Sequence, residues 1–205
     1  MFHNYTAETI STNPRDNHVS TADTIAKMSQ LVGSNLNLPI VSATAAEILA
    51  KIGKATPTEL DIISGTYWWV KRHLKFVEDN QILQQQLGVM DLEQGKELLL
   101  APEFVLSLTP NAIGDCDDFS TLLATLLVQN GITNVFFCTI AADAYEPDNY
   151  SHVYVKVILQ DGRCMALDAS HGMYPGWETK NIFKSTDWSI TGTIYHAGEG
   201  LLAIL

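Results

Sequence analysis

The chain has 205 residues, of which 46% are hydrophobic, and its formal net charge is −11. This length and composition are typical of one folded domain. The acidic balance argues against broad binding to the phosphates of nucleic acids and against docking on anionic lipid.

The first residues, 1–17, contain neither a basic head nor an apolar run, so they do not resemble a secretory signal. No stretch approaches the roughly 20 apolar residues that cross a bilayer. The three cysteines are an odd number with no close pairing, which favours a reducing compartment. We therefore expect a cytoplasmic protein, with association with a virion as the alternative.

Residues 1–42 are rich in Ser, Thr, Asn and Asp. We predict a polar N-terminal arm, partly extended, with a short helix near 21–32 that ends by Leu38-Pro39. The folded body is then predicted to span 43–205. Such an arm would suit contact with a neighbouring subunit.

The body opens with two predicted helices. The first covers 44–52 and ends at Gly53, a residue that suits a helix C-terminus. Thr56 is the expected cap of the second, Glu59 is placed for a capping box, and the apolar spacing continues to about His73.

A third helix is the strongest helical signal. It starts at Cys116 and is closed by Gly131, and its wide apolar face predicts burial in the core. Strand-like alternation follows over 135–141, 152–159 and 163–169. Helices followed by an antiparallel sheet predict an α+β fold.

The polar turn at 161–162, Asp-Gly, is typical of a two-residue β-hairpin. With that turn, His152 would lie opposite His171, and Asp168 would lie opposite Val155. The Asp168 carboxylate would then reach His152 only through a bulge or a diagonal contact.

Cys116 is a candidate nucleophile because it falls in the first turn of the buried helix. Free main-chain N–H groups and the helix dipole favour a thiolate there. Gly114 suits a tight entry and Asp115 a helix cap. The neighbouring Asp117 and Asp118 oppose a thiolate, so a cationic imidazole is needed to outweigh them.

The candidate partners of that thiol are histidines near the predicted hairpin. His152 opens a strand, and His171 is its rival as the base. Cys138 and Cys164 lie within apolar strands and are expected to be buried, inert thiols.

Several segments resemble the transglutaminase-like superfamily. GDCDDFSTLLATLLVQNGI is similar to the nucleophile segment of that family, SHVYVKVIL to its histidine strand and DGRCMALDAS to the strand of its third residue. YWWVKRHLKFVED is similar to the helix and short strand that lie upstream. The resemblance covers 43–172, and the spacing from Cys116 to His152 to Asp168 suits compact bacterial and phage members.

The resemblance implies a papain- or transglutaminase-like α+β fold and a Cys116–His152–Asp168 triad that acts on an amide bond of a protein or peptide without a cofactor. Hydrolysis and transfer to an amine both remain open. The main-chain N–H of Cys116 would be one oxyanion donor, and Asn80 or Gln81 would supply the second.

Four aromatic residues in predicted loops are candidates for substrate contact: Tyr145, Tyr150, Tyr174 and Trp177.

Two metal sites are alternatives to the triad. The carboxylates after Gly114 lack the spacing of an EF-hand, and a zinc site on Cys116, His152 and a second cysteine lacks a Cys-x-x-Cys clip. We therefore expect no metal. The alternative of another class is a non-catalytic structural or assembly protein, such as a phage virion component, that keeps the fold.

Overall fold

The structure is a computed structural model that describes residues 7–11, 17–82, 96–190 and 194–195. Its elements in chain order are β1 (Ala7–Ser11), α1 (Asn17–Asn35), α2 (Pro39–Ile52), α3 (Glu59–His73), β2 (Leu74–Phe76), α4 (Asp79–Ile82), β3 (Lys96–Leu100), α5 (Pro102–Ser107), β4 (Ala112–Gly114), α6 (Cys116–Gln129), β5 (Val135–Ala141), β6 (His152–Ile158), β7 (Cys164–Leu167), β8 (Lys184–Ser189) and β9 (Ile194–Tyr195). None of the helices within these ranges is long and apolar enough to cross a membrane.

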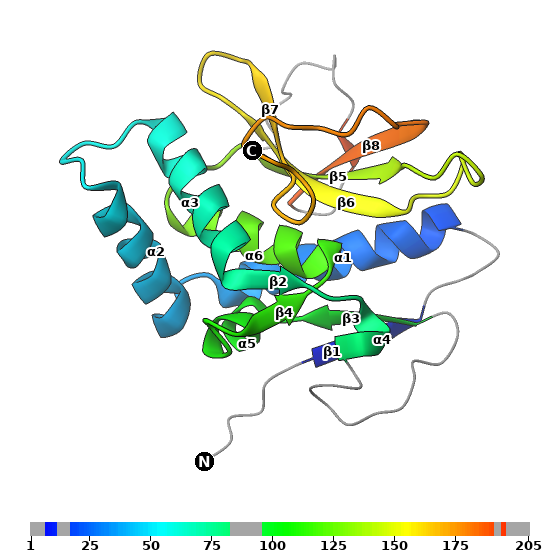
Figure 1. Cartoon of the computed structure of the whole chain (residues 1–205), viewed down its shortest axis with the longest axis horizontal. Coiled ribbons are helices and arrows are strands. Elements are labelled where there is room, and N and C mark those ends of the chain that lie inside the picture. Colours follow the sequence, from blue (N-terminus) through cyan, green and yellow to red (C-terminus); the bar gives the residue numbers. More distant parts are fainter. Residues whose placement is uncertain (1–6, 12–16, 83–95, 191–193, 196–205) are drawn as a thin grey trace, which may run out of the picture.

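The fold is a mixed α+β arrangement, as the order of the predicted elements indicates. An antiparallel sheet of order β7-β6-β5-β8-β9 lies on one side of the helices, and two small sheets, β1-β3 and β2-β4, lie on the other (Figure 1). The β2-β4 pair is parallel, and the β1-β3 pair is antiparallel. The sequence thus predicted β5, β6 and β7 of the main sheet but not the two smaller sheets.

Helix α6 is the centre of the core. Its leucines Leu122, Leu123, Leu126 and Leu127 are all completely buried. It packs on β5 and β6 and also contacts α1, α2 and α3. A helix enclosed on this many sides is buried along its whole circumference, so it is rigidly placed. The predicted bounds, Cys116 to a stop at Gly131, agree with the structure.

The N-terminal region differs from the predicted arm. Helix α1 is longer than the expected 21–32, and its side chains Ile25, Met28, Leu31 and Val32 are buried in the same core as α6. These residues form an apolar stripe at helical spacing, which the polar residues between them hide in the composition. Strand β1 pairs with β3, and α2 begins at Pro39, so the expected boundary at residue 43 falls inside a helix.

Local sequence signals correctly predicted the C-terminal cap of α2 but not the N-terminal cap of α3. Gly53 ends α2 with a φ of +68°, as predicted. The N-cap of α3 is Thr58, which forms a capping box with Asp61, instead of Thr56 with Glu59. Both pairs have the same sequence spacing, so the pattern alone left a choice of register.

The hairpin between β6 and β7 is one residue longer than predicted. The N–H of Leu159 donates to the carbonyl of Arg163 at 2.8 Å, and Gly162 adopts a φ of +84°. The loop therefore holds three residues, and Val155 pairs with Leu167 instead of Asp168. A shift of one residue moves every following side chain to the other face of the sheet.

After β7 the chain folds back along that strand. The N–H of Gly176 donates to the carbonyl of Ala166 at 2.8 Å. Strand β7 lies at the edge of the main sheet, so this returning segment covers part of the edge.

Candidate active site

Cys116 is the first residue of α6 and is partly exposed. Asp115 precedes it as an extended N-cap, and its N–H donates to the carboxylate of Asp118 at 3.4 Å. Gly114 is required here, because a Cβ at this position would lie 2.7 Å from Cβ of Asp118. The tight entry expected from the sequence is therefore a consequence of direct contact between Gly114 and the helix.

The other two thiols lie elsewhere. Cys138 is fully buried in β5, and burial raises the pKa of its thiol to about 12. Cys164, in the edge strand β7, is exposed, which corrects the expectation of a buried side chain. Cys164 is the first residue of β7, next to the hairpin, and burial increases along the strand to Ala166 and Leu167, so the apolar run did not imply burial of every residue.

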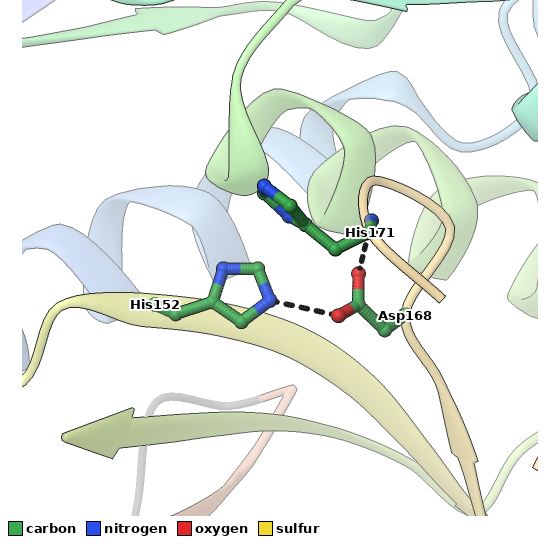
Figure 2. A group of neighbouring side chains, drawn as sticks. All are labelled: His152, Asp168 and His171. Carbon is green, nitrogen blue, oxygen red and sulfur yellow. Dashed lines mark hydrogen bonds and ion pairs between the residues drawn. The ribbon is translucent and has the colours of Figure 1, made fainter. Parts of the chain in front are cut away.

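His152 and Asp168 form a direct side-chain contact. Nε2 of His152 lies 2.9 Å from Oδ2 of Asp168, and the second ring nitrogen, Nδ1, points away from the carboxylate (Figure 2). Because the carboxylate only accepts, Nε2 donates and Nδ1 of the neutral ring keeps a lone pair. His152 therefore has one ring nitrogen held and one available.

The one-residue shift in pairing register explains the contact. Val155 lies opposite Leu167, the last residue of β7, and the same register continued by one position would place Asp168 opposite Tyr154. Residues facing each other across strands share one face of the sheet, and His152 shares that face with Tyr154. The sequence predicted this contact only through a bulge or a diagonal within a two-residue turn, whereas in the structure the longer turn changes the register and brings Asp168 to His152.

Asp168 is 3% exposed and has hydrogen bonds on both oxygens. Oδ1 accepts from the hydroxyl of Ser170 at 2.8 Å and from the main-chain N–H of His171 at 2.9 Å. Burial raises the pKa of this carboxyl, but the hydrogen bond and charge of His152, with those two donors, outweigh it and lower the pKa to about 2. Asp168 is thus built to stay ionised.

His171 contacts the pair without taking the place of His152. Its ring lies edge-on to that of His152, with centroids 5.0 Å apart, and edge-on to Phe76 at 4.8 Å. Only its main-chain N–H reaches Asp168, whereas the ring nitrogen Nδ1 lies 3.0 Å from the hydroxyl of Ser170. Burial and the nearby charge of His152 lower the pKa of His171.

Helix α3 holds the loop that carries Asp168. The hydroxyl of Tyr67, which is fully buried, donates to the carbonyl of Gly172 at 2.9 Å and lies 3.2 Å from that of Asp168. Lys71, one turn further along, donates to the carbonyl of Ala169 at 3.2 Å. Sequence reasoning missed these residues, because about a hundred residues separate the partners in the chain.

Ser120 joins the first turn of α6 to β6. Its hydroxyl donates to the carbonyl of Cys116 at 2.6 Å and lies 3.2 Å from the carbonyl of Val153. One hydroxyl thus contacts both the main chain of Cys116 and that of the residue after His152. A second link passes through Phe76, which pairs with Gly114 in the β2-β4 sheet and touches His171.

Two further carboxylates of α6 are buried. Burial and the charge of Asp115 raise the pKa values of Asp117 and Asp118 well above the ordinary value. Asp118 accepts from the N–H of Leu100 at 2.8 Å, whereas Oδ1 of Asp117 has no hydrogen-bond partner. Asp79, Asp115 and Asp118 place one oxygen each within 4.8 Å of one another, so the grouping differs from the one weighed from the sequence.

The remaining candidates lie in three places. Asn80 and Gln81 fall in α4, where the N–H of Gln81 donates to the carbonyl of Glu78. Tyr145 is 95% exposed, and Tyr150 bonds Thr186 through its hydroxyl.

Tyr174 and Trp177 follow His171 in the loop that returns along β7, and the N–H of Trp177 donates to the carbonyl of Tyr174 at 3.0 Å. Tyr174 is exposed and Trp177 is half-buried. These two aromatics therefore share a loop with Asp168 and His171.

Comparison with known proteins shows similarity in fold. No family model and no curated protein matches the chain. Among solved structures the chain is similar to a candidate protease from Parabacteroides distasonis, with a TM-score of 0.53 and 13% identity over 85% of this chain. The match covers 30% of that protein, so what the two chains share is a fold.

Proposed function

We propose that the protein is a thiol-dependent hydrolase or acyltransferase of transglutaminase-like fold that acts at an amide bond, with Cys116 as nucleophile, His152 as base and Asp168 as the residue that orients it. The observation that carries the proposal is the 2.9 Å contact between His152 and Asp168, which leaves Nδ1 of His152 available. The α+β fold shared with a candidate protease supports the same reaction class.

In the proposed mechanism Nδ1 of His152 accepts the thiol proton of Cys116, and the thiolate attacks the amide carbonyl. Asp168, ionised and fixed by Ser170 and the N–H of His171, holds the imidazole in this tautomer and stabilises its charged form. The imidazolium then protonates the leaving amine. Water or a second amine releases the acyl group from Cys116.

The oxyanion formed by the attack needs donors that are already in place. We propose the main-chain N–H of Cys116, at the start of α6, as one of these donors. We propose Asn80 or Gln81 as the source of the second donor. Tyr145, Tyr150, Tyr174 and Trp177 are proposed to contact a protein or peptide substrate.

Alkylation by iodoacetamide tests the nucleophile, and the chain contains its own reference thiol. Cys116 should alkylate more than about tenfold faster than Cys164 near neutral pH, because an ordinary thiol is only a few per cent ionised there and partial burial raises the pKa of Cys164 above the ordinary value. Peptide mapping by mass spectrometry gives both rates from one sample. His152→Ala should slow Cys116 alone, whereas His73→Ala, in the last turn of α3, should slow neither thiol.

Equal rates for the two thiols, unchanged by His152→Ala, would reject the enzyme and leave a non-catalytic structural or assembly role for this fold. If Cys116 is activated, trapping its acyl-enzyme from a peptide library identifies the acyl group. Adding a primary amine during the same reaction then separates a transferase, which forms the amide product, from a hydrolase.

A further inference from the structure

His171 gives this site a feature that the triad does not use. His152, Asp168 and His171 each offer one ligand atom, and these atoms all lie within 4.8 Å of one another. Figure 2 shows a ring nitrogen of His152 turned toward the Asp168 carboxylate and the ring of His171 beside that of His152. A zinc site on Cys116, His152 and a second cysteine lacks a Cys-x-x-Cys clip, whereas in the structure a second imidazole and a carboxylate lie beside His152.

We propose that His152, Asp168 and His171 form a Zn²⁺ site that inhibits the thiol centre, with water as the fourth ligand. Two imidazoles and one carboxylate with an open position are a common zinc ligand set. Bonds of about 2.0–2.2 Å in a tetrahedron place neighbouring ligand atoms about 3.3 Å apart. Nε2 of His152 and Oδ2 of Asp168 are 2.9 Å apart, so a small opening of this contact admits the ion.

The hydrogen bonds around the cluster prepare His171 as a ligand. The Ser170 hydroxyl gives its proton to Oδ1 of Asp168, since a carboxylate only accepts. Nδ1 of His171, 3.0 Å from the same hydroxyl, must then be the donor in that contact. Nε2 of the neutral ring therefore carries a lone pair, which is the form that binds a metal.

The same bonds orient Asp168. Ser170 and the N–H of His171 both bind Oδ1, so Oδ2 is left facing His152. Partners of this kind behind the ligands usually accompany zinc sites and fix their orientation. His171 is exposed, so its ring can adjust to the ion without disturbing the core.

Zinc at this position would block the base by moving one proton. The neutral ring of His152 has one proton, which lies on Nε2 in the contact with Asp168. When Zn²⁺ takes Nε2, that proton moves to Nδ1, the nitrogen that must accept the proton of Cys116. No thiolate–metal bond is required. The inhibition rests on the proposed function, whereas the binding does not.

Zinc binding is measured on the untagged full chain by competition with a chromophoric chelator, because a histidine tag would bind the ion itself. We expect one Zn²⁺ per chain. His171→Ala should weaken binding about tenfold or more, since even loss of an outer partner has an effect of this size. His73→Ala, which also removes one histidine but lies outside the cluster, and Cys116→Ser should bind as the wild type does.

The result that overturns the site is equal zinc affinity of wild type and His171→Ala, or loss of binding in Cys116→Ser. A second readout, alkylation of Cys116, separates the two proposals. If zinc binds as expected but Cys116 has the reactivity of an ordinary thiol, the metal site is supported and the thiol mechanism is rejected. If Cys116 is reactive but zinc affinity does not depend on His171, the thiol mechanism is supported and the metal site is rejected. Success of both predicts that zinc slows alkylation of Cys116 in the wild type only.

Discussion

The main-chain N–H of Gly172 donates to the carbonyl oxygen of Asp168 at 2.8 Å, and a Cβ at Gly172 would lie 2.4 Å from that same oxygen. The hydroxyl of Tyr67 binds the carbonyls of both residues. This turn holds the main chain of Asp168, which directly follows the end of β7. The position of the carboxylate therefore depends on a residue that has no side chain.

Gly172→Ala should destabilise the fold, because the main chain must shift to remove the 2.4 Å contact. A forced backbone shift of this kind costs about 1–3 kcal/mol in the free energy of unfolding. Gly33→Ala is the matched control, since Gly33 is exposed in α1 and a Cβ there meets no atom within 4 Å. It should be neutral or stabilise by up to about 1 kcal/mol. Urea unfolding measures both, and equal stabilities would show that the turn has room for a methyl group.

Ser120→Ala should alter the reactivity of Cys116 through the joint between α6 and β6. Thr125→Val is its control, because the Thr125 hydroxyl also bonds a carbonyl one turn back but no strand. Each change should lower the free energy of unfolding by about 1 kcal/mol. Only Ser120→Ala should also change the rate of alkylation of Cys116. The same rate in both variants would mean that the Ser120 hydroxyl supports the helix alone.

The elements that the sequence predicted well are those with local signals. Helix α6, its start at Cys116 and the glycine at the end of α2 are set by residues within a few positions of each other. The chain order of Cys116, His152 and Asp168 was evident from motifs. The hydrogen bond between the last two was not, because it depends on whether the turn at Gly162 holds two residues or three.

Other features depend on contacts across the fold. The apolar stripe of α1 is interrupted by polar residues, and its burial is decided by the presence of α6 beside it. The sequence pattern predicts Tyr67 as a core aromatic residue of α3. No residue near it in the sequence indicates that its hydroxyl donates to the carbonyl of Gly172. The roles of Asn80 and Gln81 stay predictions.

The lowered pKa of Asp168 predicts that the fold loses stability as the pH falls. Its pKa of about 2 lies below the ordinary 3.8, so the ionised carboxylate stabilises the fold above pH 4. That contribution, about 2 kcal/mol, is lost as the pH falls from about 4 to about 2. The stability difference between wild type and Asp168→Asn should therefore shrink over this range in chemical denaturation. A difference that stays constant with pH would show that Asp168 titrates normally in the folded chain.

The raised pKa of Asp117 predicts the opposite effect, a loss of stability as the pH rises. Its carboxyl is 4% exposed and has a raised pKa, so its ionised form destabilises the folded state. This effect grows as the pH rises above the ordinary value of 3.8. Asp117→Asn should match the wild type in stability near pH 3 and exceed it at neutral pH by an amount on the order of 1 kcal/mol. A less stable variant at neutral pH would reveal a favourable partner of the carboxylate.

The segment that returns along β7 has a second role, which follows from the bond between Gly176 and Ala166. An open strand edge invites pairing with another chain, and this loop occupies part of that edge. The same ten residues, 168–177, hold Asp168, His171, Tyr174 and Trp177. Changes that lengthen this loop would also uncover the edge, so the tolerance of the loop to insertions is coupled to protection of the sheet against pairing with a second chain.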